Sequence, residues 1–128
     1  MVKQRIRQAQ REMSQARAAG KVPNADVVVT NPVHVAVAIR YRQKEMERPI
    51  VLAKGQRLLA ARIKQIAEAN FVPIVENPEL AWMLYRTVPV DGSVPADLYR
   101  PVAEVLAFVY NLKRRRRRVM GFKDEPPR

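Results

Sequence analysis

The stretch VVVTNPVHVAVAIRY, residues 27–41, predicts a strand, a tight turn and a second strand. Residues 27–29 form an unbroken β-branched run, which is typical of a buried strand. Residues 35–41 alternate large apolar residues with smaller or charged ones, which is the spacing of a strand with two distinct faces. Asn31-Pro32 lies between the two runs, with His34, the single histidine of the chain. A residue before proline is disfavoured in the helical region, so the chain must bend here.

The Asn31-Pro32 bond allows a reaction that other Asn bonds seldom undergo. Because Pro32 has no backbone N–H, the usual attack of the following nitrogen on the Asn side chain is closed. The remaining ring closure is attack of the Asn31 side-chain nitrogen on its own main-chain carbonyl, which forms a succinimide and expels Pro32 as a new N-terminus. A near-attack pose contributes about 7–11 kcal/mol. A turn clamped between two strands, with stored backbone strain, would supply that pose.

These features give a hypothesis of self-cleavage between Asn31 and Pro32. Thr30 and Val33 would shape the turn. His34 has two candidate roles, as a proton relay near neutral pH or simply as a hydrogen-bonding stabiliser of the turn. The alternative is that the whole motif is an ordinary Asn-Pro turn.

A second Asn-Pro pair, Asn77-Pro78, provides an internal comparison. Asn77 is a favourable helix N-cap, Pro78 suits the first helical position, and Glu79 suits the positive end of the helix dipole. A capping Asn uses its side chain on backbone N–H groups, so we expect no cleavage at this pair.

Composition limits the class of protein. The chain has 128 residues, enough for one domain with a core, and 48% of them are hydrophobic. It has no cysteine and one histidine, so we expect no disulfide, no catalytic metal site and no cofactor. No apolar run approaches the roughly 20 residues that span a bilayer, and no signal peptide opens the chain. The piece as given is therefore expected to be soluble.

The net charge of +12 is concentrated in two arms. Residues 1–21 carry six basic residues and one acid, and residues 113–128 carry eight basic residues and two acids. The middle, residues 22–112, has ten basic and nine acidic residues, so it is nearly neutral. Basic arms on a neutral body suit anionic lipid headgroups, acidic partners or nucleic acid.

The pattern predicts three parts: a linker helix over residues 1–21, a globular domain over 22–112 and a basic, disordered tail over 113–128. Strands alternate with helices, which indicates an α/β domain whose small sheet is covered by helices. In the first half we further expect a short strand or helix lead-in at 50–52, broken by Lys54-Gly55, and a helix over 56–69. A strand over 71–75 follows, and Pro73 favours either an edge position or a strand start for it. The last expected elements are an Asn77-capped helix to about residue 86, a helix over 96–113 that either extends through 114–118 or frays there, and a disordered end over 121–128.

Several blocks occur in order along the chain: PNADVVVT (23–30), NPVH (31–34), VAVAIRY (35–41), AKG (53–55), VPIVENP (72–78), LYR (84–86), LY (98–99) and VAEVLAFVY (102–110). Together they resemble the FlhB/YscU family of type III secretion export-switch proteins, the flagellar branch more than the injectisome branch. The likeness covers roughly residues 4–112. One position departs from the family pattern: Val33 stands where the family loop has Thr, and the hydroxyl is lost. If that hydroxyl orders the turn or a water molecule, cleavage is slower here.

The resemblance implies a mixed sheet of about four strands surrounded by about four helices. It also implies self-cleavage that switches export from early rod-and-hook or needle-type substrates to later ones. This is one reaction per molecule, so no turnover enzyme is expected. The implied partners are export substrates, a hook- or needle-length control protein, and export-gate or ATPase-complex components. The full-length protein is expected to be anchored in the bacterial inner membrane, with this part on the cytoplasmic face and its first residues continuing from that anchor.

The alternative function is a nucleic-acid-binding module that uses the basic terminal arms. It predicts steeply salt-dependent binding to duplex DNA. Aromatic residues interleaved with the basic ones, an RRM-like motif and zinc ligands are missing from the sequence, so the resemblance takes precedence.

Overall fold

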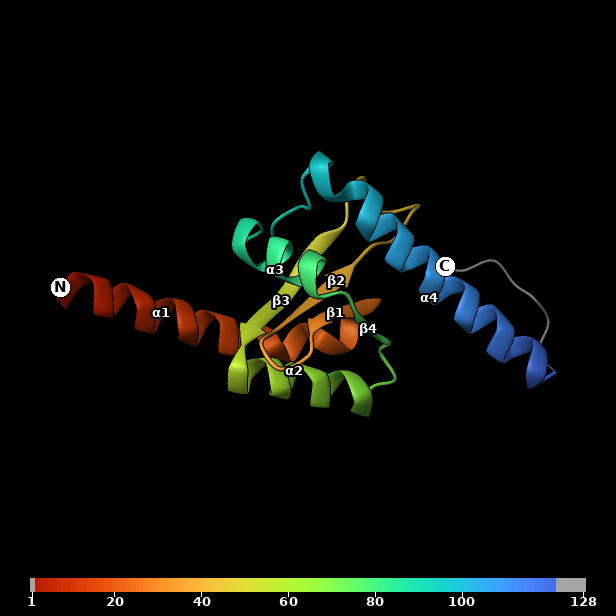
Figure 1. The fold of residues 1–128 in the computed structure, drawn as a ribbon, viewed down its shortest axis with the longest axis horizontal. Helices are drawn as coiled ribbons and strands as arrows, with labels where there is room; N and C mark the ends of the chain where they lie inside the picture. Colours follow the sequence, from red (N-terminus) through yellow and green to blue (C-terminus); the bar gives the residue numbers. More distant parts are fainter. Residues whose placement is uncertain (1, 122–128) are drawn as a thin grey trace.

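The structure is a computed structural model that describes residues 2–121, and a mixed four-stranded sheet lies at its centre (Figure 1). The strands are β1 (Val27–Asn31), β2 (Val35–Arg40), β3 (Ile50–Gln56) and β4 (Ile74–Glu76), in the spatial order β3-β2-β1-β4. β1 pairs antiparallel with β2 and parallel with β4, and β2 pairs antiparallel with β3. β1 is therefore an interior strand, hydrogen-bonded on both sides, and β4 is one edge of the sheet.

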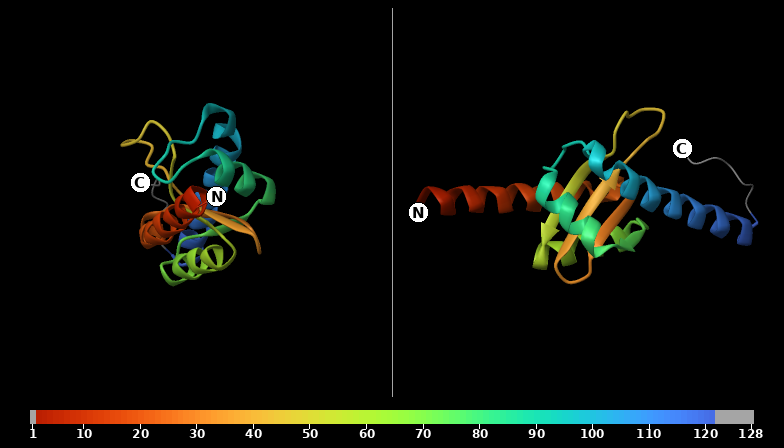
Figure 2. Two further views of the ribbon diagram at one scale, coloured as in Figure 1. Left: turned by 90° about the vertical axis from the view of Figure 1, so that its left-hand side faces the viewer. Right: turned by 45° about the horizontal axis from the view of Figure 1, so that its top comes forward.

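Helices cover both faces of the sheet, and two of them also project beyond it. α3 and α4 pack on one face, and α2 and η1 pack on the other. α1 and the second half of α4 extend outward from opposite ends of the body (Figures 1 and 2). Within residues 2–121, no helix combines the length and apolar character needed to cross a membrane. The helices are α1 (Val2–Ala18), η1 (Ala19–Asn24), α2 (Arg57–Ala69), α3 (Pro78–Thr87), η2 (Ala96–Leu98) and α4 (Tyr99–Val119).

The alternation along β2 separates two hydrophobic layers. Val35, Val37 and Ile39 enter the layer under α3 and α4, whereas Ala36 and Ala38 enter the layer under α2 and η1. All five side chains are fully buried. The predicted two-faced strand is thus confirmed, and both of its faces are interior, because small alanines let α2 approach the sheet closely.

The prediction that Lys54-Gly55 breaks the strand is wrong. β3 continues through both residues to Gln56, and Gly55 pairs with Ala36 of β2. A glycine is needed there because a Cβ atom would lie 2.5 Å from Cγ of Leu59 on α2. Gly55 therefore permits the close approach of a helix and does not end the strand.

The strand expected at 71–75 is shorter and later, since β4 begins at Ile74. Phe71 cannot extend it because its φ is 59°, a left-handed conformation that belongs to the end of α2. Pro73 favoured either an edge strand or the start of a strand, and β4 is an edge strand that begins directly after Pro73.

The two later helices follow the sequence closely. α3 begins at Pro78, and the Asn77 side chain accepts a hydrogen bond from the backbone N–H of Leu80 at 3.3 Å, as predicted for an N-cap. α4 continues through the arginine run to Val119. The predicted extension of this helix through residues 114–118 is therefore confirmed, and the assignment of residues 113–119 to a disordered tail is wrong. Arginine is a good helix former and suits the negative end of the helix dipole. The rest of the predicted disordered end, residues 122–128, lies outside the described residues.

The predicted α/β class is confirmed, with a mixed sheet of four strands and helices around it. The N-terminal helix ends at Ala18 and passes into η1, where Ala19 and Val22 are buried against the domain. η1 is therefore packed as part of the body, while the preceding α1 projects with its apolar residues Ile6 and Met13 exposed.

Candidate functional site

The predicted loop is the hairpin connection between β1 and β2. Residues 32–34 form it, and Asn31 and Val35 are the last paired residues. The backbone N–H of His34 donates a hydrogen bond to the carbonyl oxygen of Asn31, with N and O 2.9 Å apart. The carbonyl that would be attacked in a cyclisation thus already accepts a hydrogen bond.

Two backbone contacts from outside the hairpin hold this loop in place. The N–H of Asn77 donates to the carbonyl oxygen of Thr30 at 2.9 Å, and the N–H of Arg57 donates to the carbonyl oxygen of His34 at 3.0 Å. Arg57 adopts a left-handed φ of 53° as β3 passes into α2. The loop is therefore fixed on its two sides by the starts of α3 and α2, as a clamp on the turn requires.

The side chains of the loop differ sharply in exposure. Thr30 is 2% exposed, Asn31 and Pro32 are half-buried, and Val33 is 79% exposed. His34 is also exposed, and its imidazole makes no hydrogen bond or ion pair within residues 2–121. In this structure His34 stabilises the turn through its backbone. The ring lies free in solvent, where a relay through water stays a prediction.

The two Asn-Pro pairs have different surroundings. The Asn77 side chain caps α3, whereas the Asn31 carboxamide makes no hydrogen bond to any other part of residues 2–121. The Asn31 side chain, the nucleophile of the predicted cyclisation, is therefore unrestrained by hydrogen bonds, whereas the Asn31 carbonyl, the predicted point of attack, is held by one. This asymmetry matches the different roles that the sequence predicts for the two pairs.

A second polar cluster lies at the opposite end of the β1–β2 hairpin, and the sequence reading did not single it out. Asp26, which directly precedes β1, is 3% exposed. Its carboxylate forms an ion pair with Arg42 and accepts a hydrogen bond from the N–H of Tyr41 at 2.8 Å. Burial, followed by the nearby Asp26 charge, raises the pKa of Tyr110 on α4. An acidic residue directly before an apolar strand was the available signal.

Within residues 2–121, no group of three or more His, Cys, Asp or Glu side chains is arranged to hold a metal ion. The groups that the loop itself presents are the Asn31 carboxamide, the tertiary amide to Pro32, the Thr30 hydroxyl, the His34 imidazole and the backbone hydrogen bonds.

Comparison with known proteins assigns this arrangement to a family. Residues 1–109 match the family described as "FlhB HrpN YscU SpaS Family". The chain is 43% identical over 115 residues to the flagellar biosynthetic protein FlhB of Bacillus subtilis. The aligned region covers 90% of this chain and 32% of that protein. It is 49% identical over 116 residues to FlhB of Yersinia enterocolitica, and this aligned region covers 91% of this chain and 30% of that protein. The chain therefore spans about a third of the length of these relatives.

The fold has a counterpart among solved structures. The crystal structure of the cytoplasmic domain of FlhB from Shewanella putrefaciens is 38% identical, with a TM-score of 0.74. The match covers 89% of this chain and 85% of that one.

Proposed function

This chain belongs to the FlhB/HrpN/YscU/SpaS family, and from that premise we propose that it is a self-cleaving switch domain of a flagellar protein-export apparatus. In sequence and fold it corresponds to the cytoplasmic domain of that family's export components. The proposed reaction breaks the chain between Asn31 and Pro32, and the break changes which substrates are exported.

The cyclisation needs no group beyond the loop itself. Nδ2 of Asn31 attacks the main-chain carbonyl carbon of the same residue, a new C–N bond closes a succinimide, and the C–N bond to Pro32 breaks. The leaving nitrogen takes up a proton and becomes the secondary amine of a new N-terminus, and water later opens the succinimide. Each molecule reacts once, so the domain is not a turnover enzyme.

The observation that carries the proposal is the hydrogen bond from the His34 N–H to the Asn31 carbonyl oxygen at 2.9 Å. Attack on the carbonyl carbon moves negative charge onto this oxygen, and a backbone donor already in position stabilises that charge. The anchors from Asn77 and Arg57 hold the donor and the carbonyl in this relationship. By holding the reacting groups in this geometry, the turn would lower the free-energy barrier to cyclisation.

The cleaved pieces are expected to stay together. The N-terminal piece of 31 residues contains all of β1, which is the interior strand between β2 and β4. Val27, Val28 and Val29 are completely buried in the two core layers. The break would therefore release the loop ends, where the switch would act, without unfolding the sheet.

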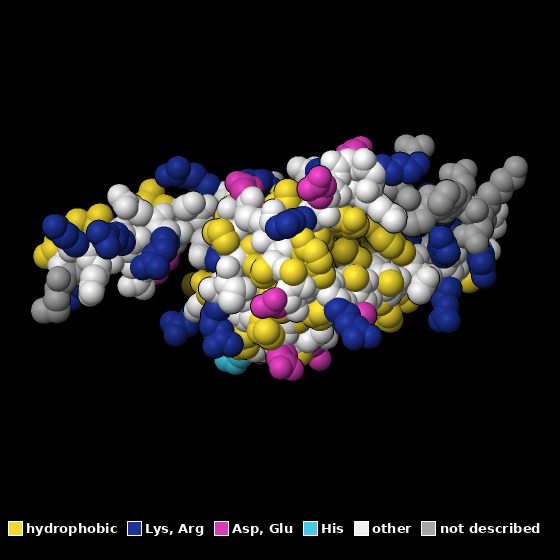
Figure 3. Space-filling view, turned by 90° about the horizontal axis from the view of Figure 1, so that it is seen from above, with side chains coloured by type: hydrophobic (Ala, Val, Ile, Leu, Met, Phe, Trp, Pro, Cys, Tyr) yellow, Lys and Arg dark blue, Asp and Glu magenta, His cyan; other side chains and the backbone are white. Residues whose placement is uncertain are grey.

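The proposed partners follow from membership of the export apparatus. They are export substrates, the hook- or needle-length control protein, and gate or ATPase-complex components. The proposed location is the cytoplasmic face of the bacterial inner membrane, with the basic arms touching anionic lipid. The alternative, nucleic-acid binding, is not favoured by the placement of these arms, because α1 and the second half of α4 extend from opposite ends of the body (Figures 1 and 2). On the face drawn in Figure 3, the Lys and Arg side chains of the described residues are scattered and do not gather into one patch.

Intact mass spectrometry and a denaturing gel of the purified chain test the proposal. We expect pieces of 31 and 97 residues (128 − 31 = 97) that elute as one species in native size exclusion. Asn31→Ala should abolish the break. Asn77→Ala is the matched control, since it removes the other Asn-Pro pair and should leave the break in place. A chain that stays whole after long incubation of folded material would contradict the proposal.

A further inference from the structure

A surface groove of about 410 Å³ lies between the α2–β4 connection and the second half of α4. This is away from the β1–β2 loop, and every residue that lines the groove belongs to the C-terminal side of the proposed cleavage point. Its size suits a few side chains of a peptide rather than a folded domain. The residues that line it are Glu68, Phe71, Val72, Pro73, Val109, Leu112, Lys113 and Arg116.

Phe71 at the edge of this groove occupies a position where phenylalanine is unfavourable. α2 ends in a Schellman motif, in which the N–H of Phe71 donates to Glu68 O at 3.3 Å and the N–H of Val72 donates to Ala67 O at 2.9 Å. This motif places Phe71 at a φ of 59°, where glycine or asparagine is the usual residue.

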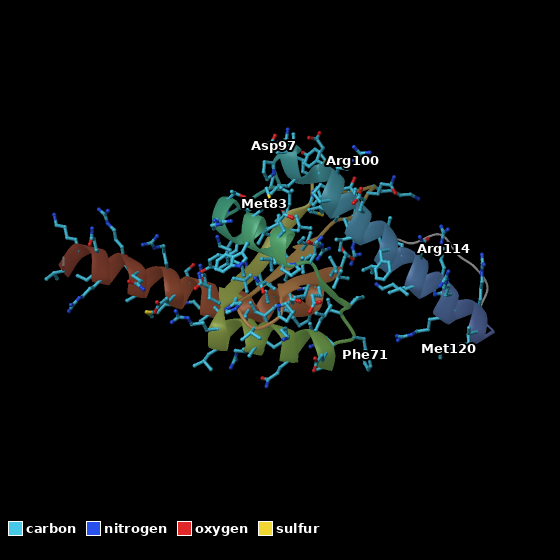
Figure 4. The ribbon with its side chains drawn as sticks, in the orientation of Figure 1. Phe71, Met83, Asp97, Arg100, Arg114 and Met120 are labelled. Atoms are coloured by element: carbon cyan, nitrogen blue, oxygen red, sulfur yellow. The ribbon has the colours of Figure 1, made fainter. Side chains whose placement is uncertain are left out.

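The ring of Phe71 gains little from packing in return. Its side chain is 87% exposed and projects away from the body, beside the groove (Figure 4). Leu112, on the facing side of α4, is 45% exposed. Phe71 thus combines an unfavourable backbone conformation with an apolar ring exposed to water. A contact with a partner, which the isolated chain lacks, would account for both features.

The charges around the groove define what it attracts. Lys113 and Arg116 line it, and Arg114 and Arg117 follow on the same exposed end of α4. Glu68 is the one acidic residue in the lining. The rim is therefore cationic beside an apolar floor, which is complementary to a carboxylate next to a bulky apolar side chain.

The adjacent sheet edge indicates the conformation of the occupant. β4 is an edge strand, and Val72 and Pro73 of the groove lead directly into it. An open edge accepts an extended segment through backbone hydrogen bonds, while grooves beside it accept alternate side chains.

We propose that this groove binds an extended acidic peptide segment of a partner protein. A bulky apolar side chain of the segment lies between Phe71 and Leu112, and neighbouring carboxylates pair with Lys113 and Arg116. Since none of these residues takes part in the Asn31 chemistry, the surface is present before and after cleavage. The inference therefore does not depend on the self-cleavage proposal.

Selection from a phage-displayed library of random twelve-residue peptides tests the site, with the 128-residue chain as the bait. We expect enrichment of peptides that combine an aromatic or large aliphatic residue with Asp or Glu. In fluorescence polarisation with an enriched peptide, Phe71→Asn should weaken binding about tenfold or more, as loss of a central apolar contact does. Phe71→Asn retains every charge and suits the left-handed backbone, so lost binding cannot be ascribed to misfolding or to altered net charge.

Two matched pairs of variants complete the test. Arg116→Glu should weaken binding about tenfold, whereas Arg62→Glu makes the same charge change on an exposed part of α2 and should leave it unchanged. Leu58→Asn removes a side chain that is 88% exposed outside the groove and should likewise leave binding intact. The proposal is overturned if no peptide is enriched, if the enriched peptides lack acids, or if Phe71→Asn binds them as tightly as the parent chain. The proposal is also overturned if the chain self-associates and Phe71→Asn abolishes that self-association, because the occupant of the groove would then be a second copy of the chain.

Discussion

Asp26 and Arg42 form an ion pair that closes the β1–β2 hairpin at the end opposite its loop. Asp26 lies directly before β1, and Arg42 follows β2 by two residues. The side chain of Asp26 is almost completely buried, whereas that of Arg42 is one-third exposed. After cleavage at Asn31, Asp26 would belong to one piece and Arg42 to the other, so this pair would link the two pieces.

Removing Arg42 should destabilise the domain more than neutralising Asp26. Arg42→Met leaves a buried carboxylate without its counter-charge and should lower the free energy of unfolding by about 3 kcal/mol. Asp26→Asn keeps an acceptor for the Tyr41 N–H and leaves an arginine that reaches water, so a loss of about 1 kcal/mol is expected. Urea unfolding followed by circular dichroism measures both.

The exposed Lys21–Asp91 ion pair serves as the control for these variants. Its N and O atoms are 2.7 Å apart, but both side chains are substantially exposed. Lys21→Met should therefore cost less than about 1 kcal/mol. Equal losses for Arg42→Met and Lys21→Met would show that burial of Asp26 does not matter.

Asn77→Ala should separate stability from cleavage. It removes the N-cap of α3 and should lower the free energy of unfolding by about 1 kcal/mol. The backbone N–H of residue 77 still donates to Thr30 O, so the rate of cleavage at Asn31 should be unchanged. The rate is read from intact mass against time, and a large reduction would mean that the Asn77 side chain acts on the loop.

Gly55→Ala should disturb the packing of α2 on the sheet. The added Cβ would lie 2.5 Å from Cγ of Leu59, which predicts a loss of about 1–3 kcal/mol. Leu59→Ala introduced with it should recover part of that loss in a double-mutant cycle. Gly20→Ala is the control: nothing lies within 4 Å of its Cβ position, so its effect should stay within about 0.5 kcal/mol.

Val33→Thr tests the departure from the family loop. The Val33 side chain is 79% exposed, so it contributes little to the packing of the turn. We expect the restored hydroxyl to change stability by less than about 0.5 kcal/mol and the cleavage half-time by less than about threefold (roughly 0.7 kcal/mol). An acceleration of a hundredfold or more would show that a hydroxyl at this position takes part in the reaction.

Phe71→Gly should stabilise the domain by about 1 kcal/mol, because glycine adopts the left-handed conformation without a steric penalty. Phe71→Ala separates backbone strain from loss of the ring, since it removes the ring but keeps a Cβ atom. It should not show the same gain in thermal unfolding. If both variants are equally stabilised, exposure of the ring and not the backbone is the source of the cost.

The sequence was most informative where local chemistry decides the conformation. The β-branched runs on either side of Asn31-Pro32, the Asn77 cap and the periodic helices are local patterns, and the structure confirms the elements they predicted. Predictions were less accurate where a residue type has more than one use. Lys54-Gly55 resembled a strand break because glycine often ends strands, but here Gly55 allows α2 to pack closely on β3. The arginine run has the composition of a charged tail, but it is helical.

The sequence by itself determined the hairpin, the position of the Asn31-Pro32 pair within it, the family and the α/β class, because each is carried by local patterns of residues along the chain. Only the tertiary structure decided that β1 lies inside the sheet between β2 and β4, that Asn77 and Arg57 anchor the loop, and that Asp26 meets Arg42. These relationships join segments that are distant in sequence. They arise because burying both faces of one small sheet leaves few ways to pack its helices, and no local pattern specifies that packing.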